Sequence, residues 1–368
     1  MIKTDPLPFY LKLSQITIGI VAFTYVLFIG QEIIVPFVFA LIIAILLNPF
    51  VGFLQRKGFN HVLAILITVM LAFIVLAVLL YFLFTQASMF TDELPQLKIK
   101  FNAMFETSIN WVSDNFNVST KKINAWIIKQ KGEGLSNSSA IIGQTLITVS
   151  GVLFTVLLIP VYVFMILFYK TLLTKFVSSL FPDEKDGMVK EVLTETKSLI
   201  QKYLVGLSIE AGLMAILNSA ALLIIGVDYA ILIGVIGALL NVIPYLGGLI
   251  AIALPMIIAI ATQSPSAALW VFIAYILIQF IDNQYIVPYI VASKVKINGL
   301  ISIIVVLIGG ALWGVAGMFL SIPLTAILKV VFDRVEPLKP WGILLGEDMP
   351  EDNKRAVSRR KKITKKMN

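Results

Sequence analysis

Residues 229–262 read YAILIGVIGALLNVIPYLGGLIAIALPMIIAIAT, an uncharged apolar stretch that is interrupted at residues 241–248. Pro244 and the pair Gly247-Gly248 mark this interruption as a turn between two helical arms. Each arm of about 15 residues is roughly 21 to 23 Å long, which is short of a hydrocarbon core of roughly 30 Å. The stretch therefore predicts a re-entrant helical hairpin, which dips into a membrane and returns to the same side.

A second uncharged stretch has the same form. Residues 299–328 read GLISIIVVLIGGALWGVAGMFLSIPLTAIL and divide near Trp313 and Gly314 into two arms that are also too short to span. A long apolar span precedes each hairpin, at 204–226 and at 267–291. Because the first of these spans runs outward and the second inward, we expect the hairpins to enter from opposite sides and their tips to meet near the midplane.

The composition places the whole chain in a membrane. Of its 368 residues 59% are hydrophobic and 14% are charged, whereas soluble domains have about 45 to 50% apolar and about 25% charged residues. Most of the other uncharged runs, such as 13–31, 33–55 and 58–91, reach spanning length. We predict an all-α polytopic membrane protein with about eight membrane segments, two of them re-entrant hairpins in inverted orientation.

Several chemical functions are excluded by the residues that the chain lacks. It has no cysteine and one histidine, His61, so zinc, thiol and haem chemistry are not expected, and we predict neither metal nor cofactor. There is no P-loop string for ATP-driven pumping. Because the spacing suggests no pair of nucleophile and base, we do not expect an enzyme.

Lys and Arg accumulate in cytoplasmic loops, so their positions give the orientation of the spans. Basic residues precede the first span, follow the second and fourth, follow residue 291 and crowd the last 15 residues. This pattern predicts that both termini are cytoplasmic. The basic tail is expected to meet anionic lipid headgroups, and a nucleic-acid arm is the less favoured alternative.

These features divide the chain into five parts. Two polar segments with helical patterns interrupt the apolar runs. The first, at 90–140, is expected to lie outside the membrane. The second, at 171–203, is expected to run directly into the fifth span as a lever or a solvated connector. The predicted parts are 1–89 (three spans), 90–140 (an external amphipathic helical insert), 141–203 (a fourth span and cytoplasmic amphipathic helices), 204–335 (a transport core with inverted span-hairpin repeats) and 336–368 (a basic cytoplasmic tail).

Broken helices in inverted repeats are a common way to build the site of a secondary transporter, because unpaired backbone groups at depth need protein, water or substrate beside them. We therefore expect a substrate site between the two tips. Its predicted residues are Asn241, Pro244, Tyr245, Gly247 and Gly248 on one side and Gly309, Gly310, Trp313, Gly314 and Gly317 on the other. The alternative is that these glycines only allow close helix packing.

Polar residues at depth extend this candidate site. Gln279, Asp282 and Asn283 share one face of the span 267–291. An ionisable group there costs roughly 2.5 to 3.5 kcal/mol, so Asp282 is the first candidate for binding a cation or carrying a proton, with a purely structural carboxylate as the alternative. Glu210 is a second coupling candidate, unless it reaches the inner interface. We interpret Asn48-Pro49 as a kink or a helix end.

Four strings resemble one known family. YLVG at 203–206, NVIPYLGG at 241–248, IDNQYIVPYIV at 281–291 and NGLISIIVVLIGGALWGVAGMFLSIPLTAILKV at 298–330 are similar to the autoinducer-2 exporter family, also called PerM permeases. The resemblance implies a transporter of the bacterial inner membrane that moves its C-terminal half like an elevator. It also implies a homo-oligomer, with a pentamer as the expected form, and export of the quorum-sensing signal autoinducer-2 or Na⁺(Li⁺)/H⁺ antiport.

The family pattern selects particular positions of this chain. They are Asn241, Pro244, Gly247, Asp282, Pro288, Gly309, Gly310, Gly314, Gly317 and Pro323. Glu210 departs from the pattern, in which an uncharged residue is expected, and this puts its coupling role in doubt or makes it a subfamily trait.

We predict a secondary transporter of the autoinducer-2 exporter type that moves a small hydrophilic solute by alternating access. H⁺ or Na⁺ is the expected coupling ion, and the expected partners are membrane lipids and copies of the chain, with no nucleic acid. The first alternative is a Na⁺(Li⁺)/H⁺ antiporter. The second is a membrane scaffold or sensor that does not transport.

Overall fold

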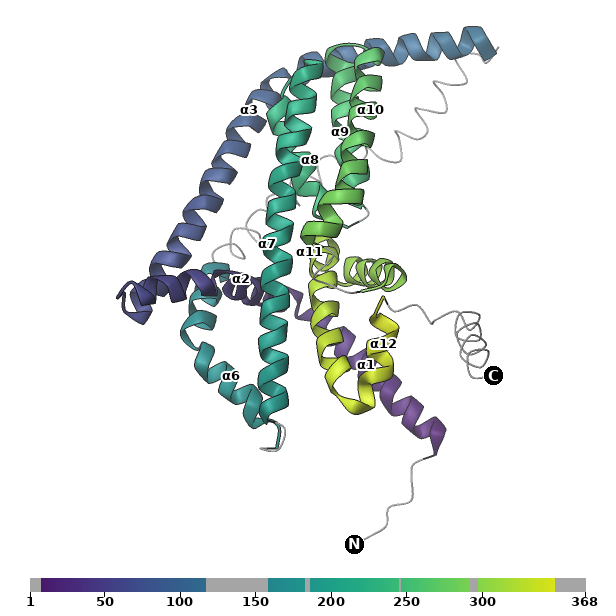
Figure 1. Ribbon diagram of the computed structural model, residues 1–368. Coiled ribbons are helices and arrows are strands. Elements are labelled where there is room, and N and C mark those ends of the chain that lie inside the picture. The colour runs from purple at the N-terminus through teal and green to yellow at the C-terminus, as the bar shows by residue number, and fades with distance from the viewer. Residues whose placement is uncertain (1–7, 117–157, 183–185, 245, 292–296, 348–368) are drawn as a thin grey trace, which may run out of the picture.

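The computed structural model describes residues 8–116, 158–182, 186–244, 246–291 and 297–347 (Figure 1). All regular structure in these ranges is helical. Six helices are long and apolar enough to cross a membrane, or seven if one bent pair counts as a span, while two shorter apolar helices fall below that length. The chain is therefore an all-helical multi-pass membrane protein, and the count of eight segments stays a prediction.

The N-terminal helices form their own small core. Helix α1 (Phe9–Ile29) leads through Gly30 into α2 (Gln31–Arg56), and α3 begins at His61. α2 and α3 pack with the helix Leu158–Phe168 around small and branched side chains, which let membrane helices approach closely. The buried members are Ala40, Ala44, Val51, Ala64, Ile65, Val69, Val163, Ile166 and Leu167. α1, in contrast, leaves most of its apolar side chains exposed.

Helix α3 (His61–Phe116) continues beyond the predicted end of the third span. The sequence predicted an insert with its own helix after residue 89, but the described chain is helical without a break up to Phe116. A change from apolar to polar residues marks where a helix leaves the membrane and does not end the helix. Ile109 is buried and Glu106 is exposed, as in an amphipathic helix. The rest of the predicted insert lies outside the described residues.

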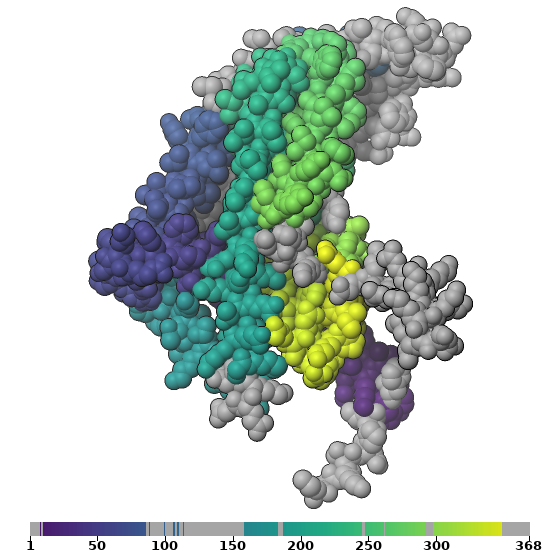
Figure 2. Space-filling view, in the orientation of Figure 1, coloured from purple at the N-terminus to yellow at the C-terminus, as the bar shows by residue number. Residues whose placement is uncertain are grey.

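The cytoplasmic interruption contains two helices. α6 (Lys170–Ser179) follows the helix Leu158–Phe168 at a bend of 66°. α7 (Asp186–Ile225) is one helix of 40 residues, and it confirms that the helix before the fifth span runs directly into that span. Figure 1 shows α7 as a rod along the middle of the molecule, and Figures 1 and 2 show α10 (Pro265–Ile281) beside the C-terminal half of α7.

Pro49 in α2 creates a contact between α2 and α7. A proline has no N–H, so the carbonyl four residues earlier loses its helical partner. That carbonyl belongs to Ile45, and it accepts a hydrogen bond of 2.7 Å from Nε2 of Gln201 in α7. The neighbouring Asn48 accepts a bond of 2.9 Å from Nζ of Lys170. The predicted irregularity at Asn48-Pro49 is therefore a docking point for α6 and α7.

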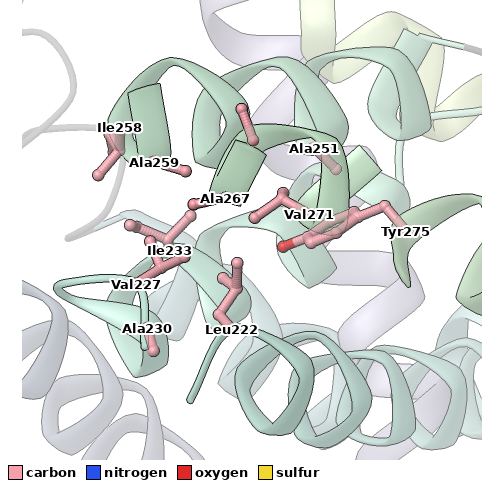
Figure 3. Close-up of a cluster of buried hydrophobic side chains, with 11 residues drawn as sticks. Leu222, Val227, Ala230, Ile233, Ala251, Ile258, Ala259, Ala267, Val271 and Tyr275 are labelled. Carbon is pink, nitrogen blue, oxygen red and sulfur yellow. The ribbon is translucent and has the colours of Figure 1, made fainter. Parts of the chain in front are cut away.

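The central helices pack around a second core, shown in Figure 3. α8 (Ala230–Asn241) follows α7 through a turn in which Gly226 and Tyr229 have φ of 83° and 57°. α9 (Leu246–Thr262) ends shortly before α10, whose N-terminal N–H of Ala267 donates to the Ser264 hydroxyl at 3.2 Å. The break between α8 and α9 lies where the sequence predicted it.

Helix α11 (Gly299–Arg334) is broken at Trp313 and Gly314, again as predicted. Gly314 has φ 60° and ψ −142°, a conformation that is essentially restricted to glycine. A Cβ on Gly309 would overlap the carbonyl of Gly317, and the reverse also holds. The two arms therefore approach each other closely beside the break. The last helices of the described residues are the short η4 (Glu336–Leu338) and α12 (Lys339–Leu345).

Candidate functional site

The candidate site is a cavity of about 580 Å³ beside the break between α8 and α9. Helices α7, α8, α9, α10 and α11 all contribute to its wall, together with the π-helix η2 (Asp282–Val291). The lining residues are Tyr203, Leu207, Glu210, Asn241, Val242, Ile243, Pro244, Gly248, Leu249, Ile252, Gln279, Asp282, Asn283, Val287, Ile297, Ser302, Ile322 and Glu347.

Asp282 is the buried acid of this cavity. Its side chain belongs to a residue that is 1% exposed, and its Oδ2 accepts a hydrogen bond of 3.0 Å from Nδ2 of Asn241. Its other oxygen, Oδ1, has no hydrogen-bond partner among the described residues. Buried polar atoms are nearly always paired, so this oxygen is a free acceptor for a ligand or a proton.

Asn241 and Gln279 connect the acid to α8 and α10. Nε2 of Gln279 lies 3.4 Å from Oδ1 of Asn241, whose amide nitrogen holds Asp282. Asn241 is the last residue of α8, and Gln279 lies one turn before Asp282. The structure thus places the predicted face of Gln279, Asp282 and Asn283 on the same cavity as the first tip.

Glu210 lies in the wall of the same cavity. It comes from α7 and is 6% exposed, so its side chain is packed inside the protein. Two buried carboxyl groups, Glu210 and Asp282, therefore line the same cavity. Such groups bind cations or exchange protons.

The π-helix was not predicted from the sequence. The pattern indicated an ordinary span over 267–291, but the helix changes type at Asp282 and remains a π-helix through Val291. π-helical turns are rare and often lie at functional sites. Pro288, which lies inside this segment, was the available signal, because a proline cannot support regular α-helical bonding.

Two adjacent glycines shape the first tip in different ways. A Cβ on Gly247 would overlap the carbonyl of Leu240, so the tight turn requires glycine there. A Cβ on Gly248 would lie 3.4 Å from Nε2 of Gln279 and 3.5 Å from Oδ1 of Asn241, at contact distance. Pro244 lines the cavity, and Tyr245 lies outside the described residues.

The residues predicted at the second tip, Gly309, Gly310, Trp313, Gly314 and Gly317, do not line this cavity. Gly309, Gly310 and Gly317 face other parts of α11, and Nε1 of Trp313 donates a bond of 3.0 Å to the carbonyl of Leu27 in α1. α11 contributes Ser302 and Ile322 from its two arms instead. The expected meeting of the tips is thus not seen at the cavity, because the glycines are used in arm-to-arm packing. A binding role for this second set stays a prediction.

Ser302 and Ile322 also show how α11 is folded. They would be about 30 Å apart along a straight helix, yet both line one cavity. The sequence did not single out Ser302 or Glu347 as site residues. Tyr203 could have been found, because it lies two turns before Glu210 on the same face of α7.

Comparisons with known proteins show the family of the chain. A family model described as AI-2E family transporter matches residues 17–336. The chain belongs to the AI-2E transporter family. It is 27% identical over 323 residues to the AI-2 transport protein TqsA of Escherichia coli, covering 86% of this chain and 90% of TqsA.

Two further relatives carry the names of candidate transport proteins. One is a protein of Haemophilus influenzae, which is 27% identical over 92% of this AI-2E chain and 97% of its own length. The other is YrrI of Bacillus subtilis, which is 26% identical over 82% of this chain and 86% of its own length. A transporter rather than an enzyme is the class that these names support.

Proposed function

We propose that the chain is a secondary transporter that exports a small hydrophilic solute of the autoinducer-2 type across the inner membrane of a bacterium. The support for the solute class is the relative TqsA, which is named an AI-2 transport protein. The cavity supports a small solute as well, because about 580 Å³ falls within the usual range of small-molecule sites. Amide and carboxyl groups in its wall suit a ligand that carries hydroxyl groups.

The observation that carries the proposal is the position of Asp282. A buried carboxyl group with one unpaired oxygen lines a cavity beside the break between α8 and α9, at the point where α10 changes into the π-helix. In membrane proteins such residues are expensive and mark substrate or ion pathways. Asp282 is accordingly the first coupling group of the proposal, and Glu210 is the second.

The short helices support re-entrant hairpins. α8 and α9 have 12 and 17 residues, and at about 1.5 Å per residue neither reaches the roughly 30 Å of a hydrocarbon core. The break at Gly314 divides α11 in a similar way. In the proposed mechanism the two hairpins enter from opposite sides, and residues 204–335 move together to expose the cavity alternately.

A Na⁺(Li⁺)/H⁺ antiporter is the second candidate function. It is favoured by the two buried carboxyl groups in the wall of one cavity, Glu210 and Asp282, since carboxylate oxygens suit hard cations. The two functions differ in what is moved: an antiporter moves protons against sodium without any organic solute.

The assembly and topology belong to the same proposal. Both termini are placed in the cytoplasm by the distribution of Lys and Arg. Copies of the chain are proposed to associate through the N-terminal helices, with five subunits as the expected number. The exposed apolar side chains of α1 support such a contact.

Solute flux in reconstituted vesicles tests the proposal. The variant Asp282→Asn keeps the size of the side chain and removes its charge, so it should abolish coupled export while leaving expression and assembly intact. Asp228→Asn is the matched control, because Asp228 is exposed in the turn before α8. Full export by Asp282→Asn would exclude Asp282 from the mechanism. Proton movement driven by sodium alone would favour the antiporter.

A further inference from the structure

A second group of buried polar atoms lies between α7, α8 and α10. Oδ1 of Asn218 and the hydroxyl of Tyr275 are buried and have no hydrogen-bond partner among the described residues. The hydroxyl of the neighbouring Ser219 is unpaired as well. Leaving a polar atom buried and unpaired costs stability, so several of them in one region indicate a shared ligand.

Gly237 shows where this ligand fits. A Cβ on Gly237 would lie 3.5 Å from Nδ2 of Asn218, 3.7 Å from the Tyr275 hydroxyl and 3.5 Å from Cβ of Ala251. These are ordinary contact distances, so Asn218 and Tyr275 both border the place that a Cβ would take, and Gly237 leaves that place unfilled between them. The space beside Gly234, one turn earlier, is filled by Ser219.

The polar layer formed by Asn218, Ser219 and Tyr275 lies close in sequence to residues that line the cavity. Gly237 lies one turn before Asn241 on α8, and Tyr275 lies one turn before Gln279 on α10. On its other side the layer is capped by apolar side chains, among them Leu222 and Val271. Figure 3 shows the Tyr275 side chain crossing this cluster, with its hydroxyl in the interior. The polar layer therefore lies one helical turn from cavity-lining residues on both α8 and α10 and stops below an apolar cap.

We propose that Gly237 keeps open a buried water site held by Asn218 and Tyr275, and that this water is a second station of a proton path that leads to Asp282. The oxygens of this site are neutral and few, whereas hard cations need many oxygen ligands, usually with carboxylates among them. The site therefore fits water and a moving proton better than Na⁺. The proton role rests on the proposed transport function, and the water site does not.

A double-mutant cycle in thermal unfolding of the full chain tests the water site. Tyr275→Phe and Asn218→Leu each remove one polar group at nearly constant volume. With a shared water, each variant should lower the unfolding temperature, and the double variant should lose less than the two losses added together. If the atoms are simply unpaired, each variant should match or exceed the wild type, which would overturn the site.

Gly237→Ala fills the space with a methyl group without a clash. Tyr275→Phe should then cause no further loss in the Gly237→Ala background. Gly212→Ala in α7 is the control for the effect of alanine on helix stability, since no heavy atom lies within 4 Å of its added Cβ. An undiminished effect of Tyr275→Phe in the Gly237→Ala background would also overturn the site.

Proton movement tests whether the water site is part of a proton path. In vesicles loaded with a pH-sensitive dye, Gly237→Ala should lose proton movement, and Gly212→Ala should keep it. Retention in Gly237→Ala overturns the proton role, as does a wild type that moves the solute without protons. A wild type that moves neither contradicts the proposed transport function itself, and the unfolding cycle still decides whether the water site exists.

Discussion

Nδ2 of Asn241 donates a hydrogen bond of 3.0 Å to Oδ2 of Asp282. This bond joins the last residue of α8 to the first residue of the π-helix, and so it connects a broken helix to a helix of unusual type. Because both residues line the cavity, a ligand that competes for either side chain changes the contact between two backbone elements.

The Asn241–Asp282 bond should contribute measurably to stability. Asn241→Ala leaves both oxygens of Asp282 unpaired, and the expected loss is about 1 to 3 kcal/mol in the free energy of unfolding. Asn283→Ala, which alters an exposed amide of the same cavity, should cost much less. Chemical or thermal unfolding of the two variants in detergent measures the difference, and equal stability would show that the bond is not formed.

Gly247 and Gly248 should respond differently to the same substitution. Gly247→Ala forces the backbone of the turn apart, so we expect poor folding and a low unfolding temperature. Gly248→Ala fits at contact distance from Gln279 and Asn241, and should fold normally while reducing transport. Expression level, unfolding temperature and flux for the pair distinguish the two effects. A well-folded Gly247→Ala protein would contradict the described turn.

The two arms of α11 should separate when the glycines between them are enlarged. Gly317→Ala places a methyl group on the carbonyl of Gly309, whereas Gly310→Ala meets the flexible end of the Met318 side chain. We expect Gly317→Ala to be destabilised strongly and Gly310→Ala to be tolerated. Unfolding temperatures compare the two, and similar values would argue against the close approach of the arms.

The contribution of Gln201 to stability should depend on Pro49. Gln201→Leu removes the donor to the Ile45 carbonyl, with an expected loss of about 1 kcal/mol. In the Pro49→Ala background the new N–H can pair with that carbonyl inside α2, so the same substitution should cost less. A double-mutant cycle in unfolding measures this coupling. Additive losses would indicate that Gln201 acts through other contacts.

The helix breaks could be predicted from the sequence because they depend on local chemistry. Apolar arms too short for a membrane, Pro244 and the glycine pairs indicate a broken helix wherever it packs. The depth of Asp282 and its shared face with Gln279 follow from helical spacing, and the structure places both residues on the cavity.

Other features depend on packing between distant segments, which spacing does not reveal. The pairing of Gly309 with Gly317 and the bond from Trp313 to Leu27 explain why the second tip is absent from the cavity wall. The π-helix at Asp282 and the continuation of α3 to Phe116 were missed for another reason. Helix type and helix ends follow backbone hydrogen bonding, and hydrophobicity reports mainly on burial.

The most direct test of the central claim is the accessibility of the first tip from each side of the membrane. The chain has no cysteine, so Ile243→Cys introduces a single thiol beside the cavity. Membrane-impermeant thiol reagents should label it in right-side-out and in inverted vesicles, and transported solute should slow the labelling. Labelling from one side alone, unaffected by solute, would contradict a transporter that alternates access through this cavity.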